Sequence, residues 1–486
     1  MAVIGGAQAV NIMISILRMK VLAILLGPSG VGLLSIYHSL LGVVTTAAGL
    51  GMGSSGVRQI ASAKGEEQEL SRVRRVLLAA HLVQGALAML AVWLLRAPIS
   101  AWLFGDQSYA TEVGLIGVAI LLTLLGTAQT TLLQGMRRIG DLGRVTVLSA
   151  LVGTIAGLAA VWAYGAPGLI WFVVIQPLAI IVIALRYTRR LPQPTAIRPS
   201  AAALWQVWKP MAKLGAAFML GGLATAATLL LVRGLITRDL GLEAAGHFAA
   251  AWAISMTYIS VLLGALASDY YPRLAGVIND RAATNRLIND QVQIGLAIGG
   301  PVLLLMLGLA PWITTLLYTV DFAPAAELLQ WQTVGNVFKL ACWALSFAFA
   351  AAARSKIFLL TQINFNVVFL IILLPGLNKF GLIVTGPAFL FAYAAHFALL
   401  NLLAIKFLKF KWMSLSIRLL TMHVSLSIVL LILAQFDQIA TLIVAPLLSG
   451  ITAIFGIRVV LIKIGPGGKI LTRLSRLYSS AGWPIR

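Results

Sequence analysis

Four basic residues lie within long apolar stretches of this sequence, where charged side chains are rare. They are Arg18, Lys20, Arg233 and Lys339. A Lys or Arg near the centre of a membrane helix costs roughly 2.5–3.5 kcal/mol on insertion scales, so such residues usually face a cavity or a pathway. A phosphate or another anion would supply the missing negative charge. For Arg18 and Arg233, extension of the side chain towards a membrane surface is the open alternative.

The acidic residues avoid this depth. All 14 of them fall outside the apolar stretches or near their ends, whereas a carboxylate that binds a coupling ion or relays a proton is expected within a helix. Four neutral residues near the cations could hydrogen-bond the hydroxyls of a sugar: Gln129, Gln134, Gln332 and Asn336. Hydrogen bonding between helices is the equally open alternative for each of them. We therefore predict a cationic cavity that binds an anionic substrate.

The sequence carries no enzyme motif that we recognise. Its nearest approach to a phosphate-binding loop, Gly465-Pro466-Gly467-Gly468-Lys469, lacks the required spacing and the hydroxyl residue. The single cysteine, Cys342, lies in an apolar segment, and the five histidines are too scattered to suggest a metal site. We expect a transporter and not an enzyme, with no cofactor and no metal.

The elements that must position these residues are membrane-spanning helices. Hydrophobic residues make up 60% of the 486 residues and charged ones only 10%, against about 25% charged in soluble proteins. Apolar segments of about 20 residues, the length that crosses a bilayer, recur along the whole chain. The predicted class is an all-α integral membrane protein with fourteen transmembrane helices. The segments are 3–26, 31–54, 74–96, 112–134, 145–164, 168–187, 211–232, 246–267, 293–316, 327–350, 357–376, 383–405, 415–434 and 439–462.

The basic residues predict how the chain is oriented. The formal net charge is +22, and 29 of the 36 Lys and Arg residues fall in alternate loops and in the tail after 457, against four in the loops of the opposite side. Basic residues collect on the cytoplasmic side of membrane proteins, so we predict that both termini are cytoplasmic. The basic loops would then contact anionic lipid headgroups, and the charge needs no nucleic-acid partner.

An internal repeat predicts two lobes. The segment Leu26–Gly32 resembles 240–246, and the same offset of 214 residues relates Ser54 to Ser268 and Phe104 to Tyr318. We predict two parallel six-helix lobes, at 1–190 and 211–405, joined by a cytoplasmic linker at 191–210. Residues 406–486 would add a helix pair and a basic cytoplasmic tail. Transporters built from parallel repeats rock one lobe against the other.

Several short motifs occur in an order that is typical of one family. They are KVLAILLGPSGVG at 20–32, APIS at 97–100, LFG at 103–105, YPRL at 271–274, WQTVGNVFK at 331–339 and ARSK at 353–356. Over about residues 1–405 the chain resembles the Wzx-type flippases of the polysaccharide-transporter branch of the MOP superfamily, above all the O-antigen and lipid III translocases. It departs from many members by its helices after 415 and by Asn336, where an acidic residue is expected.

The resemblance implies a V-shaped two-lobe fold in the bacterial inner membrane. It implies movement of an undecaprenyl-pyrophosphate-linked oligosaccharide from the cytoplasmic to the periplasmic leaflet, with Lys20 and Lys339 in the family's basic cavity and Arg18 and Arg233 as further candidates. A polysaccharide polymerase and a chain-length regulator are the protein partners to consider. Two alternatives stay open: a multidrug or small-molecule antiporter of related fold, and a membrane scaffold of polysaccharide assembly.

Overall fold

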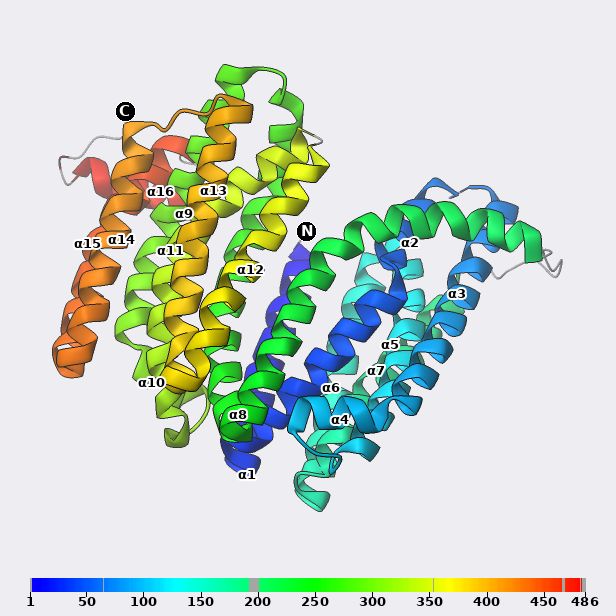
Figure 1. Cartoon of the computed structure of the whole chain (residues 1–486). Helices are drawn as coiled ribbons and strands as arrows, with labels where there is room; N and C mark the ends of the chain where they lie inside the picture. Colours follow the sequence, from blue (N-terminus) through cyan, green and yellow to red (C-terminus); the bar gives the residue numbers. More distant parts are fainter. Residues whose placement is uncertain are drawn as a thin grey trace. The chain divides into compact units, whose positions relative to one another are not determined.

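The computed structural model describes residues 2–63, 65–191, 201–352, 354–465, 468–480 and 482. In these residues the regular elements are α-helices and two short 3-10 helices, without a strand (Figure 1). The predicted all-α class is therefore confirmed. Part of the predicted linker, residues 192–200, lies outside the described residues, as does Ala353 of the ARSK motif.

Eleven helices of the described residues are long and apolar enough to cross a membrane. Three of these stretches far exceed the roughly 20 residues that one crossing needs: Gly6–Gly49, Met219–Ala267 and Lys356–Leu408. Each contains a break, so each can supply two crossings. This division agrees with the fourteen helices predicted from the sequence, a count that stays a prediction.

The breaks in the first two stretches are glycines with a positive φ. Helix α1 (Ala2–Gly49) breaks at Gly27, where φ is 61°. Helix α8 (Ala201–Val277) breaks at Gly241, where φ is 90°. Only glycine adopts this backbone conformation at little cost. The third stretch is interrupted by the 3-10 helix η2 (Gly381–Val384) between α12 (Ser355–Phe380) and α13 (Thr385–Leu408).

The chain forms two compact units. The first contains Met1–Ala249 and Leu317–Thr319. Its further helices are α2 (Met52–Ser62), α3 (Glu67–Leu94), α4 (Arg96–Phe104), α5 (Ala110–Gly135), α6 (Ile139–Tyr164) and α7 (Gly168–Thr188). Its main packing pairs are α6 with α7, α3 with α5, and α5 with α7. Leu103, Ile116 and Phe172 lie fully buried in one of its hydrophobic clusters.

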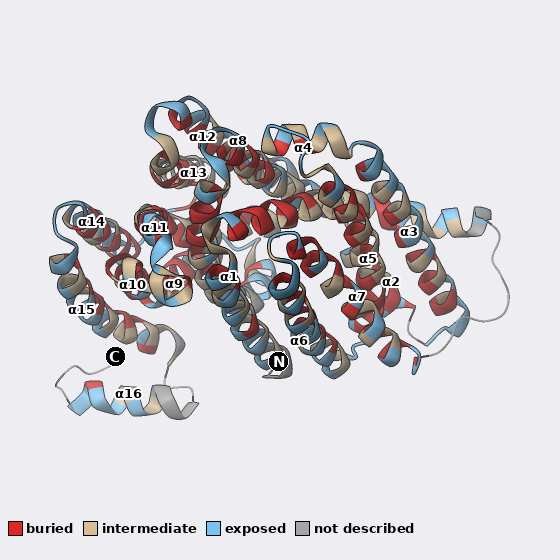
Figure 2. Cartoon of the chain, turned by 90° about the horizontal axis from the view of Figure 1, so that it is seen from below, coloured by how far each residue is buried: buried red, intermediate tan, exposed pale blue. Residues whose placement is uncertain are grey.

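The second unit contains Ala250–Leu316 and Val320–Arg486. Besides the second half of α8 and helices α12 and α13, it contains α9 (Arg281–Gly308), α10 (Ala310–Leu317), η1 (Val320–Phe322), α11 (Ala323–Ala351), α14 (Ser414–Phe436), α15 (Gln438–Ile464) and α16 (Gly468–Ser480). Buried residues follow one side of most of the long helices in Figure 2, and exposed residues the other. Large apolar side chains occur on the exposed side, among them Trp162 in the first unit and Phe436 in the second. Such a surface suits a lipid environment.

The C-terminal helix pair α14–α15 is packed specifically on α9. The fully buried side chain of Asn289 accepts hydrogen bonds from the backbone N–H of Met413 at 2.9 Å and from Ser416 Oγ at 2.8 Å. Gly456 on α15 lies so close to the carbonyl oxygen of Ala297 that a Cβ would collide with it. Helices α14 and α15 are thus an integral part of the second unit.

The two helix breaks of the first unit contact each other reciprocally. A Cβ at Gly32 would collide with the carbonyl oxygen of Leu242, and a Cβ at Gly246 would collide with that of Pro28. The offset of 214 residues that defines the sequence repeat relates Gly32 to Gly246 and Pro28 to Leu242. This is the reciprocal packing that a two-fold repeat predicts. By contacts, residues 211–249 belong to the first unit, while the lobe boundaries defined by the repeat stay a prediction.

Candidate functional site

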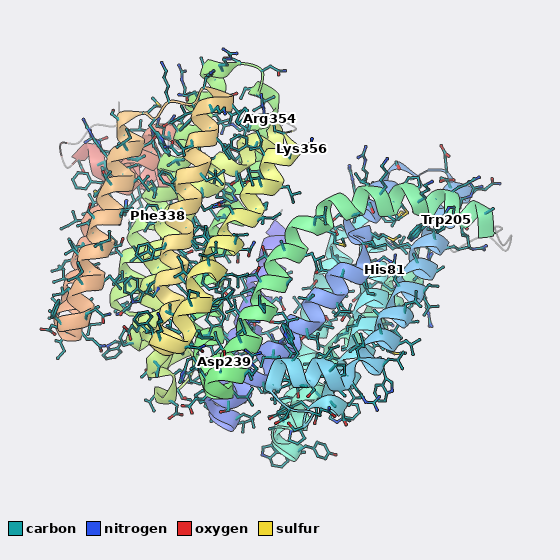
Figure 3. All side chains as sticks on the ribbon, viewed as in Figure 1. His81, Trp205, Asp239, Phe338, Arg354 and Lys356 are labelled. Carbon is teal, nitrogen blue, oxygen red and sulfur yellow. The ribbon has the colours of Figure 1, made fainter. Side chains whose placement is uncertain are left out.

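Lys339 lies within the second unit, near the middle of α11. Figure 3 labels its neighbour Phe338, about halfway along the helix. The Lys339 Nζ atom lies 3.0 Å from the sulfur of Met256 and 5.4 Å from the ring centroid of Tyr393. The ion pairs of the described residues do not include Lys339. A sulfur atom and an aromatic ring are weak partners for an ammonium group. The positive charge of Lys339 can therefore be balanced by a bound anion.

A cavity of about 260 Å³ adjoins this lysine inside the second unit. Its polar and aromatic lining comes from three helices: Lys339, Trp343 and Ser346 on α11, Gln362 on α12, and Tyr393 and His396 on α13. The residues lining the cavity include no Asp or Glu. The arrangement therefore offers one cation, several hydrogen-bonding groups and aromatic surfaces to a bound molecule.

Gln332 and Asn336 share a face of α11 with Lys339 but do not line this cavity. Both are fully buried. Asn336 donates a hydrogen bond of 2.7 Å to Ser255 Oγ on α8, and neither polar atom of the Gln332 side chain has a hydrogen-bond partner among the described residues. For Asn336 this is the bonding between helices that the sequence left open.

Arg18 lies in the first unit and bonds neutral groups. Its Nη1 donates to Gln176 Oε1 on α7 at 3.1 Å, its Nη2 donates to Ser15 Oγ at 3.3 Å, and its guanidinium lies 5.3 Å from the ring centroid of Phe172. Lys20, two residues further on, donates to the backbone carbonyl of Tyr318.

Arg233 approaches the same region of the first unit from α8. Its Nη1 donates to the carbonyl oxygen of Ser35 at 3.0 Å and also to the hydroxyl of Ser39. His38 lies close enough to both Arg18 and Arg233 to interact with each electrostatically. Both arginines thus lie within electrostatic range of His38, and neither has a carboxylate partner among the ion pairs of the described residues.

Gln129 and Gln134 do not belong to this cluster. Gln129 accepts a hydrogen bond of 2.9 Å from Thr188 Oγ1 at the end of α7. Thr188 is twelve residues beyond Gln176, or about 18 Å along the helix. Gln134 is exposed near the end of α5. For Gln129, the structure again shows hydrogen bonding between helices.

The first unit contains a second cavity, of about 310 Å³. Hydroxyl residues of α1 and α5 line it, including Thr45, Thr123 and Thr127, together with His81 of α3 (labelled in Figure 3). Thr45 and Thr127 donate to carbonyls of their own helices, so their oxygens can still accept. This cavity is lined without a charged residue.

Comparison with known proteins identifies the family of the chain. The family model described as polysaccharide biosynthesis protein matches residues 21–327. The chain belongs to this family. It is 24% identical over 406 residues to the curated lipid III flippases of Escherichia coli (strain K12) and Shigella flexneri, a match that covers 81% of the chain and 95% of each relative.

Solved structures show the same fold. The lipid II flippase MurJ in an inward closed conformation matches with a TM-score of 0.69 at 14% identity, over 96% of this chain and 100% of that one. A MATE family multidrug resistance transporter of the MOP superfamily, in an inward-facing conformation, matches with a TM-score of 0.66 at 16% identity, over 82% of this chain and 95% of that one. The predicted MOP-type fold is confirmed. This polysaccharide biosynthesis protein is thus a multi-pass membrane protein of a transporter fold.

Sequence reasoning missed four polar residues of this polysaccharide biosynthesis protein. Gln176 contacts Arg18, His38 interacts electrostatically with Arg18 and Arg233, and Gln362 and His396 line the cavity beside Lys339. A signal was available for Gln176, because a glutamine next to Pro177 interrupts an otherwise apolar helix. The histidines gave no such signal, because they are scattered in the sequence.

Proposed function

We propose that this protein is a flippase for undecaprenyl-pyrophosphate-linked oligosaccharide, which it moves from the cytoplasmic to the periplasmic leaflet of the bacterial inner membrane. The observation that carries the proposal is Lys339, a cation at mid-helix beside a cavity, without an ion-pair partner in the described part of the chain. Relatives named as lipid III flippases, which this chain matches over most of their length, support the same substrate class.

The chemistry of the substrate fits these residues. A pyrophosphate carries negative charge and strong hydrogen-bond acceptors, which an ammonium or guanidinium group in a site of low dielectric binds well. The polyprenyl chain is apolar and can stay in the lipid, whereas the sugar hydroxyls need polar partners throughout the crossing. Lys339 is the side chain that we assign to the pyrophosphate, and Arg18 and Arg233 stay further candidates.

The distribution of basic residues supports the direction of transport. With both termini in the cytoplasm, 29 Lys and Arg residues lie on the cytoplasmic side. Figure 3 places Arg354 and Lys356 together at one end of the second unit, an end that this orientation makes cytoplasmic. Alternating access by rocking of the two predicted lobes would then carry the glycan across. Membrane lipids are the surroundings, and a polysaccharide polymerase and chain-length regulator are the partners that would use the product.

The proposal is tested in a bacterial strain that depends on this chain for surface polysaccharide. Lys339→Ala is expected to abolish most of the surface display at normal protein level, because the pyrophosphate loses its cation. The matched control is Lys379→Ala, which removes an exposed lysine at the far end of α12 and should leave display unchanged. Full display by the Lys339→Ala variant would refute the role of this lysine.

A multidrug antiporter is the second candidate, because a MATE family transporter shares the fold. Such coupling calls for a free carboxylate within a helix. Asp290, ten residues into α9, is already paired with Lys463, and Asp239 and Asp269 on α8 are paired with Arg238 and Arg273. Drug resistance conferred by this chain, and lost when the sodium and proton gradients are collapsed, would favour the antiporter.

A further inference from the structure

The last helix of the chain, α16, is amphipathic and takes no part in the site described above. It has 13 residues, fewer than the roughly 20 that one membrane crossing needs. Leu477 and Tyr478 follow Leu474 by three and four residues, so these three apolar residues share one face of the helix. The sequence has the same spacing one turn earlier, at Ile470 and Leu471. Such a face needs an apolar surface to cover it.

Basic residues lie beside this apolar face. Arg473 and Arg476 are three residues apart and both are exposed, and the sequence adds Lys469 one turn before Arg473. The sequence contains no acidic residue between Gln438 and the end of α16. The ion pairs of the described residues include neither arginine. The positive charge of α16 can therefore attract an anionic partner.

A contact with α15 fixes the depth of α16. The hydroxyl of Tyr478 donates to the backbone carbonyl of Ile454 on α15, and Arg458, one turn further along α15, lies within electrostatic range of Tyr478. About 20 residues, enough for one crossing, lead from Gln438 at the start of α15 to Arg458. The contact therefore lies near the end of the membrane-crossing part of α15, and α16 runs crosswise to that helix (Figures 1 and 2).

Protein covers only part of the apolar face. Tyr478 is the one buried side chain among those described on α16, whereas Leu477 is 58% exposed. Figure 2 shows exposed residues along much of the helix. At the end of a membrane crossing, the surface next to Leu477 is the boundary where acyl chains meet phosphate groups.

We propose that α16 lies in the plane of the cytoplasmic leaflet and binds anionic phospholipids there. Its apolar face contacts acyl chains while Arg473 and Arg476 contact phosphate groups, which is the arrangement of amphipathic helices that lie on membranes. Basic residues next to the cytoplasmic leaflet are attracted by its negative surface potential, and the predicted cytoplasmic C-terminus puts α16 on that side. The inference concerns the lipid around the protein, so it goes beyond the proposed flippase function and does not depend on it.

The test places a fluorescent label on either side of α16 in the full-length protein. The single cysteine, Cys342, is buried, and Cys342→Ala removes it so that the label attaches only to an introduced cysteine. Leu477→Cys labels the apolar face, and Ser479→Cys, two residues and about 200° further round the helix, labels the opposite side. Each protein is reconstituted in nanodiscs with equal parts of phosphatidylcholine and phosphatidylglycerol, one of which carries bromine on its acyl chains and quenches the label on contact.

Brominated lipid is expected to quench the label at position 477 strongly and the label at position 479 weakly. At position 477, brominated phosphatidylglycerol should be preferred over brominated phosphatidylcholine by at least about fivefold, the factor that one basic residue supplies near an anionic surface. Arg473→Gln/Arg476→Gln should lower this preference to about twofold or less, and so should high salt, because it screens surface charge. The matched control, Arg238→Gln/Lys379→Gln, removes two exposed basic residues outside α16 and should leave the preference unchanged.

Two outcomes would overturn the inference. Quenching at position 477 that is no stronger than at position 479 would mean that protein covers the apolar face, for example a second copy of this chain. Equal quenching by the two lipids, or a preference that survives the loss of both arginines, would exclude anionic lipid as the partner. Neither outcome bears on transport of the lipid-linked glycan, which the surface-display experiment decides separately.

Discussion

Replacement of Lys339 by methionine should separate stability from function. Methionine has nearly the same length but no charge. The structure gives Lys339 no carboxylate partner among the described ion pairs, so folding bears the cost of burying its ammonium group, roughly 2.5–3.5 kcal/mol on insertion scales. The interaction with the Tyr393 ring, 5.4 Å away, returns about 0.5–2 kcal/mol. Lys339→Met should therefore stabilise the protein by about 0.5–3 kcal/mol.

The same substitution should weaken binding of the pyrophosphate. A hydrogen bond to a charged group contributes about 1.5–3 kcal/mol, so the affinity for undecaprenyl pyrophosphate should fall by roughly 10- to 150-fold. Thermal unfolding in detergent and binding in nanodiscs measure the two effects on the same preparation. Lys379→Met, at an exposed site, should change neither quantity.

A destabilised Lys339→Met protein would refute this reasoning. It would mean that the lysine is held by favourable contacts within the second unit and has a structural role. An unchanged affinity for the bare lipid would refute the assignment of the pyrophosphate to Lys339, whatever happens to stability.

Three further predictions follow from contacts of the described residues. Asn289→Ala should lower the free energy of unfolding by about 1–3 kcal/mol, because it leaves the buried hydroxyl of Ser416 and the backbone N–H of Met413 without their partner; thermal unfolding measures it. Gly246→Ala should abolish surface display or lower stability by at least about 1–3 kcal/mol, because its methyl group meets the backbone at Pro28. Gly264→Ala, with open space around its Cα, should have neither effect. If the charge of Arg233 contacts the substrate, Arg233→Lys should keep part of the transport activity and Arg233→Met should lose it. Equal activity of the two variants in a proteoliposome flipping assay would favour a purely structural role.

Positions on a single helix could be predicted from the sequence, whereas contacts between helices could not. Lys339 was expected at mid-helix, and α11 places it there. The residue that bonds Arg18 was not expected, because Gln176 lies 158 residues away on another helix. Gln129 was expected near the cations, but its partner is Thr188. Which faces of two helices meet depends on close contacts such as that of Gly153 with Gln176, and small residues are too common in this chain to single out such pairs.

The sequence by itself determined the environment of the protein and the chemistry available to it. A bilayer requires helices of about 20 apolar residues and tolerates few charges within them, so composition and spacing alone indicate the membrane class and single out the buried cations. The tertiary structure alone decided which polar groups surround each cation. It placed His38 within electrostatic range of Arg18 and Arg233, and it brought Gln362 and His396 from α12 and α13 to the cavity beside Lys339. The physical reason is that the lipid bilayer constrains the length and apolar composition of each helix separately. A binding site, by contrast, depends on how several helices pack together.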